Sequence, residues 1–297
     1  MNSAIITDIF RTWRQCAPKR VERCSVGLAN QVYIVECEGE KYVLRCNPEG
    51  PYSGTIHWLT ELSSLDIPVP RVLHSGKAGD LHYLILNYME GEDLGLVYPS
   101  LLGAEKKRIA KAVTEIQKTV SHLPLENVDP LWSWHDYLDA MLARAETRIE
   151  VNGYFASGRV HQLKVTKVRL DAYFSTIRPT AYLDDISTKN LLIHNGQLSG
   201  IIDIDWMGVG DSLTFIALTY VALRNMGYDT DYAEYLLEER SCNPIEQKAF
   251  LFYCLMYCVD FMGELGMRFG DKTVAVNEEI VDRLNWIYDD LWKKWCQ

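Results

Sequence analysis

The sequence has no hydrophobic stretch long enough to cross a bilayer. Its most apolar run, from Phe250 to Val259, spans ten residues, about half of the ~20 that a membrane-spanning helix needs. The opening segment, from Asn2 to Arg14, carries too many polar side chains for a signal peptide. We therefore expect no membrane partner and a cytoplasmic location.

The cysteines also lack the spacings that mark metal or disulfide frameworks. There are eight, with no Cys-x-x-Cys and no histidine at ligand spacing. This pattern favours reduced, mostly buried thiols over disulfides or zinc. Cys254 and Cys258 are one helical turn apart, and packing in the core is the simplest role for them.

Positive charge is scarce. Lys and Arg number 30 against 40 Asp and Glu, which gives a net charge of −10 and argues against a nucleic-acid partner. A hydrophobic fraction of 48% and a charged fraction of 24% are ordinary for a globular protein. At 297 residues without visible repeats, we expect one large domain or two closely packed ones. Nothing in the sequence indicates an oligomeric state.

What the sequence does contain is a predicted β-hairpin with polar groups at its ends. Leu191–Ile193 and Leu198–Ile202 have strand character, and Asn195-Gly196 between them is typical of a tight turn. The hairpin would bring Asn190, before the first strand, beside Asp203, after the second.

These two side chains suggest a cation site. The amide oxygen of Asn190 and the carboxylate of Asp203 suit an oxygen-preferring cation such as Mg²⁺. Asp185 lies five residues before Asn190 in a polar loop, and it could face the group that the metal ion binds. The alternative is that such acids are solvated turn residues, and a lone Asp-x-x-x-x-Asn is a weak signal.

The order Asp185-x-x-x-x-Asn190, then Asp203, resembles protein-kinase-like phosphotransferases, and most closely the aminoglycoside phosphotransferase family of small-molecule kinases. Gly200 and Gly210-Asp211 fall on positions of the same family. The resemblance implies that Asp185 accepts the proton of an attacking hydroxyl group. It further implies that Asn190 and Asp203 hold the metal ions.

The chain departs from the family pattern around this loop. Leu183 and Asp184 replace a frequent His-Gly, Ser187 replaces a frequent second histidine, and Phe215 replaces a frequent aspartate. The carboxylates of Asp185 and Asp203 and the amide of Asn190 remain in place. The departures at positions 183, 184 and 187 affect how the loop is braced, and the departure at Phe215 is expected to cost a structural hydrogen bond.

The first part of the chain has the pattern of a helix followed by an antiparallel sheet. Ser3 can cap an amphipathic helix. Three strands are predicted next, as a meander: Arg20–Val26, Gln31–Cys37 and Lys41–Cys46. A strand entered through Ile67-Pro68-Val69-Pro70 and another over Leu81–Asn87 follow.

The resemblance assigns nucleotide roles in this region. Gly27 lies where kinases have a phosphate-covering loop, and Arg45 where they have a phosphate-pairing lysine. The helix over 54–64 would supply a glutamate to this cation, but Glu61 lies later than the usual position, near Thr55. The sequence therefore leaves open whether Arg45 pairs with Glu61. The nucleobase would meet the backbone of four hinge residues: Leu86, Asn87, Tyr88 and Met89.

The rest of the chain has helical periodicity. Helices are predicted over 104–121, 131–151, 158–177, 212–226, 231–239, 244–265 and 273–295. Trp132, Trp134 and Tyr137 could form a core cluster or a cage for a quaternary ammonium ligand. Taken with these elements, the resemblance implies an α+β, bilobal, protein-kinase-like fold. Residues 1–90 would form a small lobe with an antiparallel sheet, and residues 91–297 a larger, mostly helical lobe.

The resemblance implies transfer of the γ-phosphate of ATP or GTP, with Mg²⁺, to a hydroxyl group of a small molecule. Residues 205–297 hold sixteen acidic side chains against eight basic ones, which would suit a polycationic aminoglycoside antibiotic. Short sequence motifs, among them the segment 39–47 and Gly210-Asp211-Ser212, are similar to those of the hygromycin-phosphorylating branch of the family. Candidate substrate contacts are Asp184, Asp205, Asp260 and Glu264.

Other readings stay open at this point. The acceptor could be choline, homoserine, a sugar or a macrolide. The protein could also bind nucleotide without transferring phosphate, or be an unrelated helical interaction domain.

Overall fold

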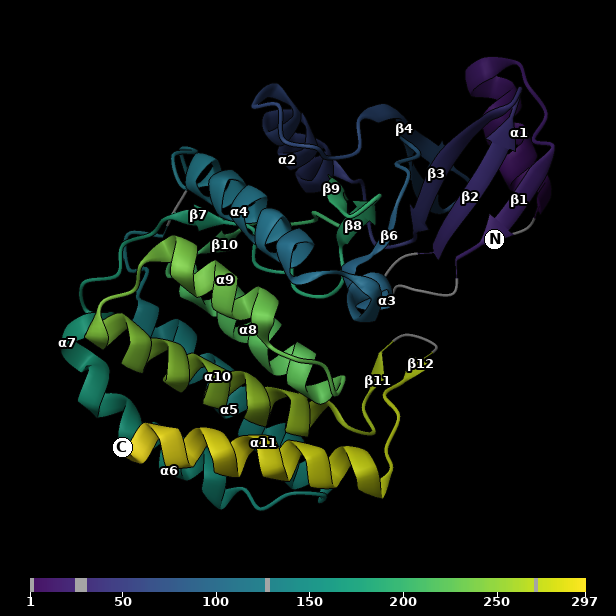
Figure 1. Cartoon of the computed structure of the whole chain (residues 1–297). Helices are drawn as coiled ribbons and strands as arrows, with labels where there is room; N and C mark the ends of the chain where they lie inside the picture. Colours follow the sequence, from purple (N-terminus) through teal and green to yellow (C-terminus); the bar gives the residue numbers. More distant parts are fainter. Residues whose placement is uncertain (1–2, 25–30, 126–128, 270–271) are drawn as a thin grey trace. The chain divides into compact units, whose positions relative to one another are not determined.

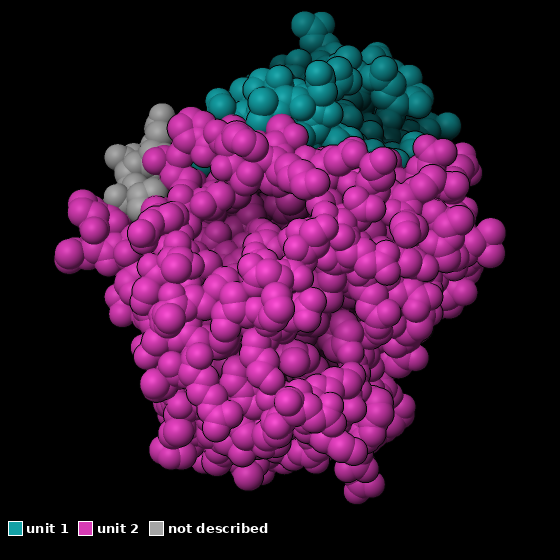
Figure 2. All heavy atoms as spheres, turned by 60° about the vertical axis from the view of Figure 1, so that its left-hand side comes forward, with its two compact units in different colours: residues 1–91, 199–206, 269–272 teal, residues 92–198, 207–268, 273–297 magenta. Residues whose placement is uncertain are grey.

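The structure is a computed structural model that describes residues 3–24, 31–125, 129–269 and 272–297. The predicted turn at Gly27 lies outside the described residues. The chain divides into two compact units (Figure 2). Unit 1 comprises residues 1–91, 199–206 and 269–272, and unit 2 comprises residues 92–198, 207–268 and 273–297.

A five-stranded antiparallel sheet of order β1–β2–β3–β5–β4 dominates unit 1 (Figure 1). The predicted meander of its first three strands is confirmed. Glu38 and Gly39 turn β2 into β3 with φ angles of 55° and 83°, the left-handed conformation that a two-residue hairpin loop requires. The strands are β1 (Arg20–Arg23), β2 (Gln31–Cys37), β3 (Glu40–Asn47), β4 (Val72–Ala78) and β5 (Leu81–Asn87).

Two helices complete unit 1: α1 (Ser3–Arg14) and α2 (Ser53–Ser64). Alpha-helical spacing places Ile6, Ile9 and Phe10 of α1 on one face, and all three are buried in the sheet's core cluster. Residues of the sheet contribute the other side of this cluster: Tyr33, Val35, Tyr42, Leu44, Cys46, Tyr83 and Ile85.

Cys16 and Cys37 in the same cluster are joined by a disulfide, so the expectation of reduced thiols is wrong for this pair. The two residues are 21 positions apart in sequence, and only the packing of the segment after α1 against β2 brings their Cα atoms to 6.5 Å. The other six cysteines, all among the described residues, are free thiols.

Unit 2 is built around α10 (Pro244–Glu264), which packs against α5, α6, α8 and α11. Its side chains are buried on almost every side because helices cover it all round. Asn243 caps its start by accepting hydrogen bonds from the backbone of Ile245 and Glu246. The other helices are α3 (Leu94–Val97), α4 (Gly103–Val120), α5 (Trp134–Asn152), α6 (Gly158–Lys167), α7 (Asp171–Phe174), α8 (Leu213–Asn225), α9 (Asp231–Arg240) and α11 (Glu278–Cys296), with short 3₁₀ helices η1 (Tyr98–Ser100) and η2 (Val168–Leu170).

Capping side chains explain why two helices start later in the sequence than predicted. Helix α5 starts at Trp134 because Ser133 Oγ accepts a hydrogen bond from Asp136 N. Helix α11 starts after Asn277, whose side chain accepts from Ile280 N. Among the described helices, none has the length and apolarity to span a membrane.

Short strands lie beside the loops that carry the predicted chemistry. The order β6–β8–β9 joins β6 (Glu92–Asp93), β8 (Leu191–His194) and β9 (Gln197–Ile201), and β7 (Ala181–Tyr182) pairs with β10 (Gly208–Val209). The predicted Asn195-Gly196 turn is confirmed, with φ angles of 51° and 68°. Strands β11 (Arg268–Phe269) and β12 (Lys272–Thr273) form a further pair.

Candidate active site

The predicted site residues are distributed over both units. Unit 1 contains the predicted nucleotide residues Arg45 and 86–89, together with Asp203 and Asp205. Unit 2 contains the predicted base and amide and three acceptor candidates: Asp184, Asp185, Asn190, Asp260 and Glu264.

The loop 183–190 of unit 2 is closed by a hydrogen bond between its predicted functional residues. Asn190 Nδ2 donates to the backbone carbonyl of Asp185 over 2.8 Å. The amide oxygen of Asn190 is then the side-chain atom left to ligate a metal. Asn190 has a φ of 69°, a left-handed conformation that Asn adopts more readily than most residues.

A buried glutamine holds the start of this loop. Gln117, in the last turn of α4, accepts from Leu183 N at 2.9 Å and donates through Nε2 to Leu183 O at 2.7 Å. The side chain thus pairs with the backbone as a neighbouring strand would. Leu183 stands where the related family often has histidine, so this clasp braces the loop through its backbone instead.

Strand β6 and helix α3 hold the other end of the loop. Asp93 accepts from Asn190 N at 3.1 Å, and Gly95 N donates to Thr188 O at 2.7 Å. A Cβ on Gly95 would come within 3.0 Å of that carbonyl, so glycine permits the close approach. Burial raises the pKa of Asp93, although the Asn190 N–H and the charge of Lys189 oppose the shift.

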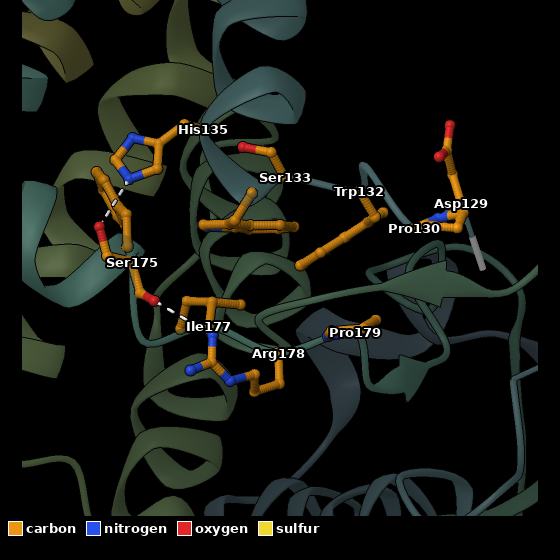
Figure 3. A pocket seen from close by; sticks show the side chains of 11 residues that line it. Asp129, Pro130, Trp132, Ser133, His135, Ser175, Ile177, Arg178 and Pro179 are labelled. Atoms are coloured by element: carbon orange, nitrogen blue, oxygen red, sulfur yellow. Dashed lines mark hydrogen bonds between the residues drawn. The ribbon is translucent and has the colours of Figure 1, made fainter.

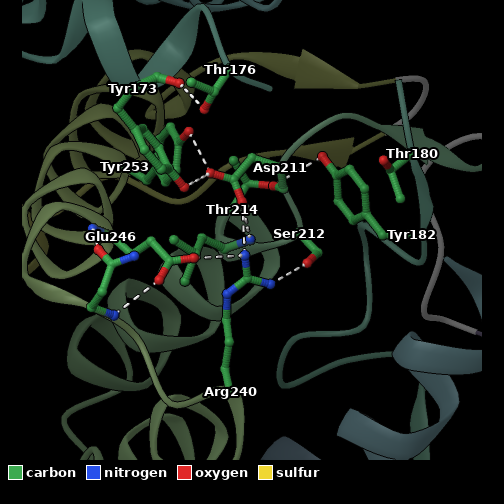
Figure 4. A network of polar contacts seen from close by, with 12 residues as sticks. Tyr173, Thr176, Thr180, Tyr182, Asp211, Ser212, Thr214, Arg240, Glu246 and Tyr253 are labelled. Atoms are coloured by element: carbon green, nitrogen blue, oxygen red, sulfur yellow. Dashed lines mark hydrogen bonds and ion pairs between the residues drawn. The ribbon is translucent and has the colours of Figure 1, made fainter. Parts of the chain in front are cut away.

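Asp211, just after β10, is the centre of a buried polar network (Figure 4). The residue is 3% exposed, and its carboxylate accepts from Tyr173 Oη at 2.7 Å, Tyr253 Oη at 2.8 Å and Leu213 N at 3.0 Å. Arg240 lies 3.4 Å away. Burial, and then the charge of Asp211, raise the pKa of Tyr173, so its hydroxyl stays a donor.

This network anchors the strand pair that leads into the loop. Gly208 and Val209 of β10 pair with Tyr182 and Ala181, directly before Leu183. Asp211 therefore fixes one strand of the pair, and the other strand delivers the chain to the loop 183–190.

In unit 1, Arg45 at the end of β3 lies among carboxylates. It is 5% exposed, and its Nη2 is 2.6 Å from Asp205 Oδ2 and 3.2 Å from Asp203 Oδ1. Thr55 Oγ1 of α2 donates to the second oxygen of Asp205 at 2.8 Å. Asp203 has a left-handed φ of 61°, and burial raises its pKa against the opposing effect of Arg45.

The predicted nucleobase segment lies at the end of β5. Asn87 is paired with Arg71 on both sides: Asn87 N donates to Arg71 O at 3.2 Å, and Asn87 Oδ1 accepts from Arg71 N. Leu86 belongs to the strand, opposite Val43. Tyr88 and Met89 follow the strand end, so their backbone is the part of the segment outside the sheet.

Two of the acceptor candidates in unit 2 are paired with arginines of α5. Asp260 Oδ1 lies 3.4 Å from both Arg144 and Arg148, and Glu264 lies 3.7 Å from Arg148. Burial, and then the charge of Asp260, raise the pKa of Glu264. Asp184 is half-buried in the loop. The surface here carries both signs of charge.

A pocket of about 530 Å³ lies elsewhere in unit 2 (Figure 3). Trp132 and Trp134 both line it. Trp134 is nevertheless only 2% exposed, stacks on Tyr137 at 4.6 Å and donates to Tyr253, as a core residue does. Among the described residues, none of the predicted site residues lines this pocket. The low exposure and the ring stacking of Trp134 confirm the core interpretation for that residue.

Sequence reasoning missed three residues that hold the predicted site: Gln117, Asp93 and Thr55. Each is a buried or half-buried polar side chain on an element remote in sequence from its partner. The only signal for Gln117 is a polar residue at a core position of an amphipathic helix. Thr55 carried a stronger signal, since it occupies the place where a glutamate was expected.

The chain is similar to known phosphotransferases. A family model described as the phosphotransferase enzyme family (APH) matches residues 20–241. A Staphylococcus aureus protein described as an "uncharacterized protein in ileS 3′ region" is 26% identical over 102 residues, covering 33% of this chain and 72% of that protein.

Solved structures share the fold across nearly the whole chain. The apo form of a thermostable mutant of aminoglycoside phosphotransferase APH(4)-Ia has a TM-score of 0.68 and 17% identity, covering 99% of both chains. A mutant of the same enzyme with ADP and hygromycin B has a TM-score of 0.65 and 15% identity over 96% of both chains. ADP-bound APH(2″)-Ib has a TM-score of 0.65 and 14% identity over 99% of both chains. The predicted α+β, protein-kinase-like fold is confirmed.

Proposed function

The chain belongs to the phosphotransferase enzyme family, and from this premise we propose that it transfers the γ-phosphoryl group of ATP or GTP to a hydroxyl group of a small molecule. The observation that carries the proposal is the closed loop 183–190, in which Asn190 Nδ2 is bound to Asp185 O. That bond closes the turn that carries the Asp185 carboxylate at one end and the Asn190 amide oxygen at the other. The fold shared with nucleotide-bound aminoglycoside phosphotransferases supports it.

Asp185 would act on the acceptor. The hydroxyl oxygen forms a bond to the γ-phosphorus as the bond to the β,γ-bridging oxygen breaks, and the nucleoside diphosphate leaves. Asp185 takes the hydroxyl proton. Most of the rate gain in such transfers comes from positioning and charge stabilisation, which is why the hydrogen bonds that hold the loop matter.

Asn190 of unit 2 and Asp203 of unit 1 would hold Mg²⁺. The Nδ2 of Asn190 is taken by Asp185 O, so its amide oxygen would be the ligand, and the side chain of Asp203 is 51% exposed. Amide and carboxylate oxygens are the ligands that Mg²⁺ prefers. When bound, Mg²⁺ neutralises negative charge on the phosphates. Arg45 would contribute a second positive charge to the same phosphates.

The first test replaces the predicted base while keeping its shape. Asp185→Asn should lower kcat by about 10²-fold or more, because a positioned base is lost, while nucleotide affinity stays unchanged. Steady-state kinetics and calorimetric binding of a non-hydrolysable ATP analogue measure the two quantities. Normal turnover by the asparagine variant would exclude Asp185 as the base.

A contrasting variant separates base from metal ligand. A ligand that binds the folded state raises the unfolding temperature. Because Asp203→Ala removes a proposed metal ligand, it should abolish the part of this stabilisation by nucleotide that depends on Mg²⁺. Asp185→Asn should retain that part. Equal behaviour of the two variants would contradict their separate roles.

For the acceptor we propose an aminoglycoside-type antibiotic, whose O-phosphorylation would confer resistance. The acidic excess of residues 205–297 supports a polycationic substrate. Related folds have been solved with hygromycin B and with gentamicin.

A second candidate acceptor is a less cationic alcohol, such as a metabolite or a macrolide. The observation favouring it is that Arg144 and Arg148 already pair with Asp260 and Glu264. An aminoglycoside ammonium group would have to compete with these guanidinium groups.

A coupled nucleotide-consumption screen distinguishes the candidates. It should cover aminoglycosides, macrolides, choline, homoserine and sugars, each with ATP and with GTP, and use Asp185→Asn as the control. Turnover with aminoglycosides alone supports the antibiotic role. Turnover with small alcohols supports the second candidate, and nucleotide binding without turnover of any acceptor would indicate a catalytically silent protein.

A further inference from the structure

Arg45 is a buried charge, and the structure shows what compensates it. Its side chain is 6% exposed and would be strongly unfavourable there without carboxylate partners. Asp205 is the nearer partner at 2.6 Å, and Asp203 is the farther one at 3.2 Å. The guanidinium group also lies over the ring of Tyr52, with its carbon atom 5.6 Å from the ring centre.

Helix α2 reaches this pair through a hydroxyl group and not through a carboxylate. Thr55, 5% exposed, donates to Asp205 Oδ1, while Arg45 binds Asp205 Oδ2. Both oxygens of Asp205 are therefore engaged, which fixes the orientation of the carboxylate. Glu61 lies six residues after Thr55, about 240° further round the helix, and faces another direction.

We propose that Asp205, buttressed by Thr55, is the positioning residue for Arg45. It supplies from the segment after Asp203 the carboxylate that a helix glutamate supplies in kinases. The inference rests on the proposed function, because it assumes that Arg45 binds nucleotide phosphates. It gives Asp205 a role different from the substrate contact expected from the sequence.

The arrangement has a consequence for Asp203. Arg45 Nη2 lies between the two carboxylates, so Asp205 competes with Asp203 for the guanidinium group. Removing the charge of Asp205 would leave Asp203, the proposed metal ligand, to take over the pairing. A guanidinium group held by Asp203 opposes a cation at the same oxygens. Asp205 thus keeps Asp203 available for metal.

The test measures binding of a non-hydrolysable ATP analogue by calorimetry, with and without Mg²⁺, together with KM for nucleotide and for acceptor. Asp205→Asn should weaken nucleotide binding by about 10-fold, the size of one hydrogen bond to a charged group, and raise the Mg²⁺ concentration needed for half-maximal binding. KM for the acceptor should not change. Thr55→Val, which has nearly the same shape, should show the same effect at about 3-fold.

Matched variants separate positioning from loss of folding. Thr55→Ser keeps the hydroxyl group and should restore wild-type nucleotide affinity. Glu61→Gln, on the same helix, should bind nucleotide as wild type does. Thermal unfolding of each variant without nucleotide shows whether it is folded. If Asp205→Asn does not fold, the Thr55→Val variant provides the test instead.

Two results would overturn the inference about Asp205 and leave the proposed function intact. One is wild-type nucleotide affinity in a folded Asp205→Asn or Thr55→Val protein. The other is an Asp205→Asn protein whose acceptor KM rises while nucleotide binding is unchanged, since this would make Asp205 a substrate contact. A wild-type protein that binds no nucleotide would overturn the proposed function as well.

Discussion

At the scale of single residues, this chain differs from the family pattern in the side chains that form its supporting hydrogen bonds and ion pairs. Leu183 takes the place of a frequent histidine, and the backbone clasp from Gln117 supplies the bracing. Thr55 takes the place of a glutamate, and Asp205 supplies the carboxylate. In each case the substituted side chain is compensated by a residue from another segment of the chain.

The Gln117 clasp leads to a prediction. Gln117→Leu leaves the buried N–H and C=O of Leu183 without their partner, at a cost of about 1–3 kcal/mol for each group. The free energy of unfolding should fall by about 2–6 kcal/mol, measured with urea. Because Asp185 is two residues away, kcat should fall more than KM for nucleotide rises.

Thr114→Val is the matched control for this variant. Thr114 is buried on the same helix, but its hydroxyl group donates only to Ala110 O within α4. The control should keep kcat. Equal losses of kcat in both variants would mean that α4 acts through general stability and not through the clasp.

At the scale of elements, local sequence signals decided most boundaries. Strands β2 and β5 and the starts of α9 and α10 match their predicted positions, because alternation, turn residues and caps are local properties. The segment predicted as one helix over 158–177 is instead divided into α6, η2 and α7. Its amphipathic pattern continues through the break, so periodicity alone could not locate it.

A lysine of α4 is paired with the segment just before α9. Lys106 of α4, 5% exposed, donates to both oxygens of Asp229 at 2.8 Å, and Tyr98 Oη donates to Asp229 at 2.9 Å. Burial would raise the pKa of Asp229, but these hydrogen bonds outweigh it and lower the pKa below 3.8. A lowered folded-state pKa stabilises the fold above about pH 4, and this stabilisation is lost as pH falls through the folded-state value.

Asp229→Asn should therefore unfold at a lower temperature than wild type at pH 7, and the gap should close as the pH falls below about 4. Differential scanning calorimetry across this range measures it. Glu238→Gln is the control, because the exposed Lys107–Glu238 pair at 3.4 Å joins α4 to α9 and is screened by water. A gap that stays constant with pH would contradict the assignment.

At the scale of the whole molecule, the net charge of −10 bears on substrate capture. Long-range attraction concentrates a polycation and is screened by salt, since the Debye length is about 10 Å at 0.1 M ionic strength. For an aminoglycoside acceptor, KM should rise several-fold between about 0.05 and 0.3 M NaCl at constant kcat. A neutral alcohol should show no such rise.

Salt titration of KM thus tests the acceptor class independently of the screen. KM for nucleotide serves as the internal control, because an anionic ligand is repelled by the same charge and should bind no worse as salt is added. A salt-independent KM for an aminoglycoside would show that the acidic excess has no part in its capture.

The sequence by itself determined the strands, the hairpin turn, most of the helices and the order of Asp185, Asn190 and Asp203, because each follows from residues close together in the chain. The roles of those three residues stay predictions. Only the tertiary structure decided their supporting contacts. Gln117 and Leu183 are 66 positions apart, Arg45 and Asp205 are 160 apart, and the Cys16–Cys37 disulfide spans 21. A buried polar group takes whichever partner the packed chain brings within hydrogen-bond distance, and no local pattern encodes that choice.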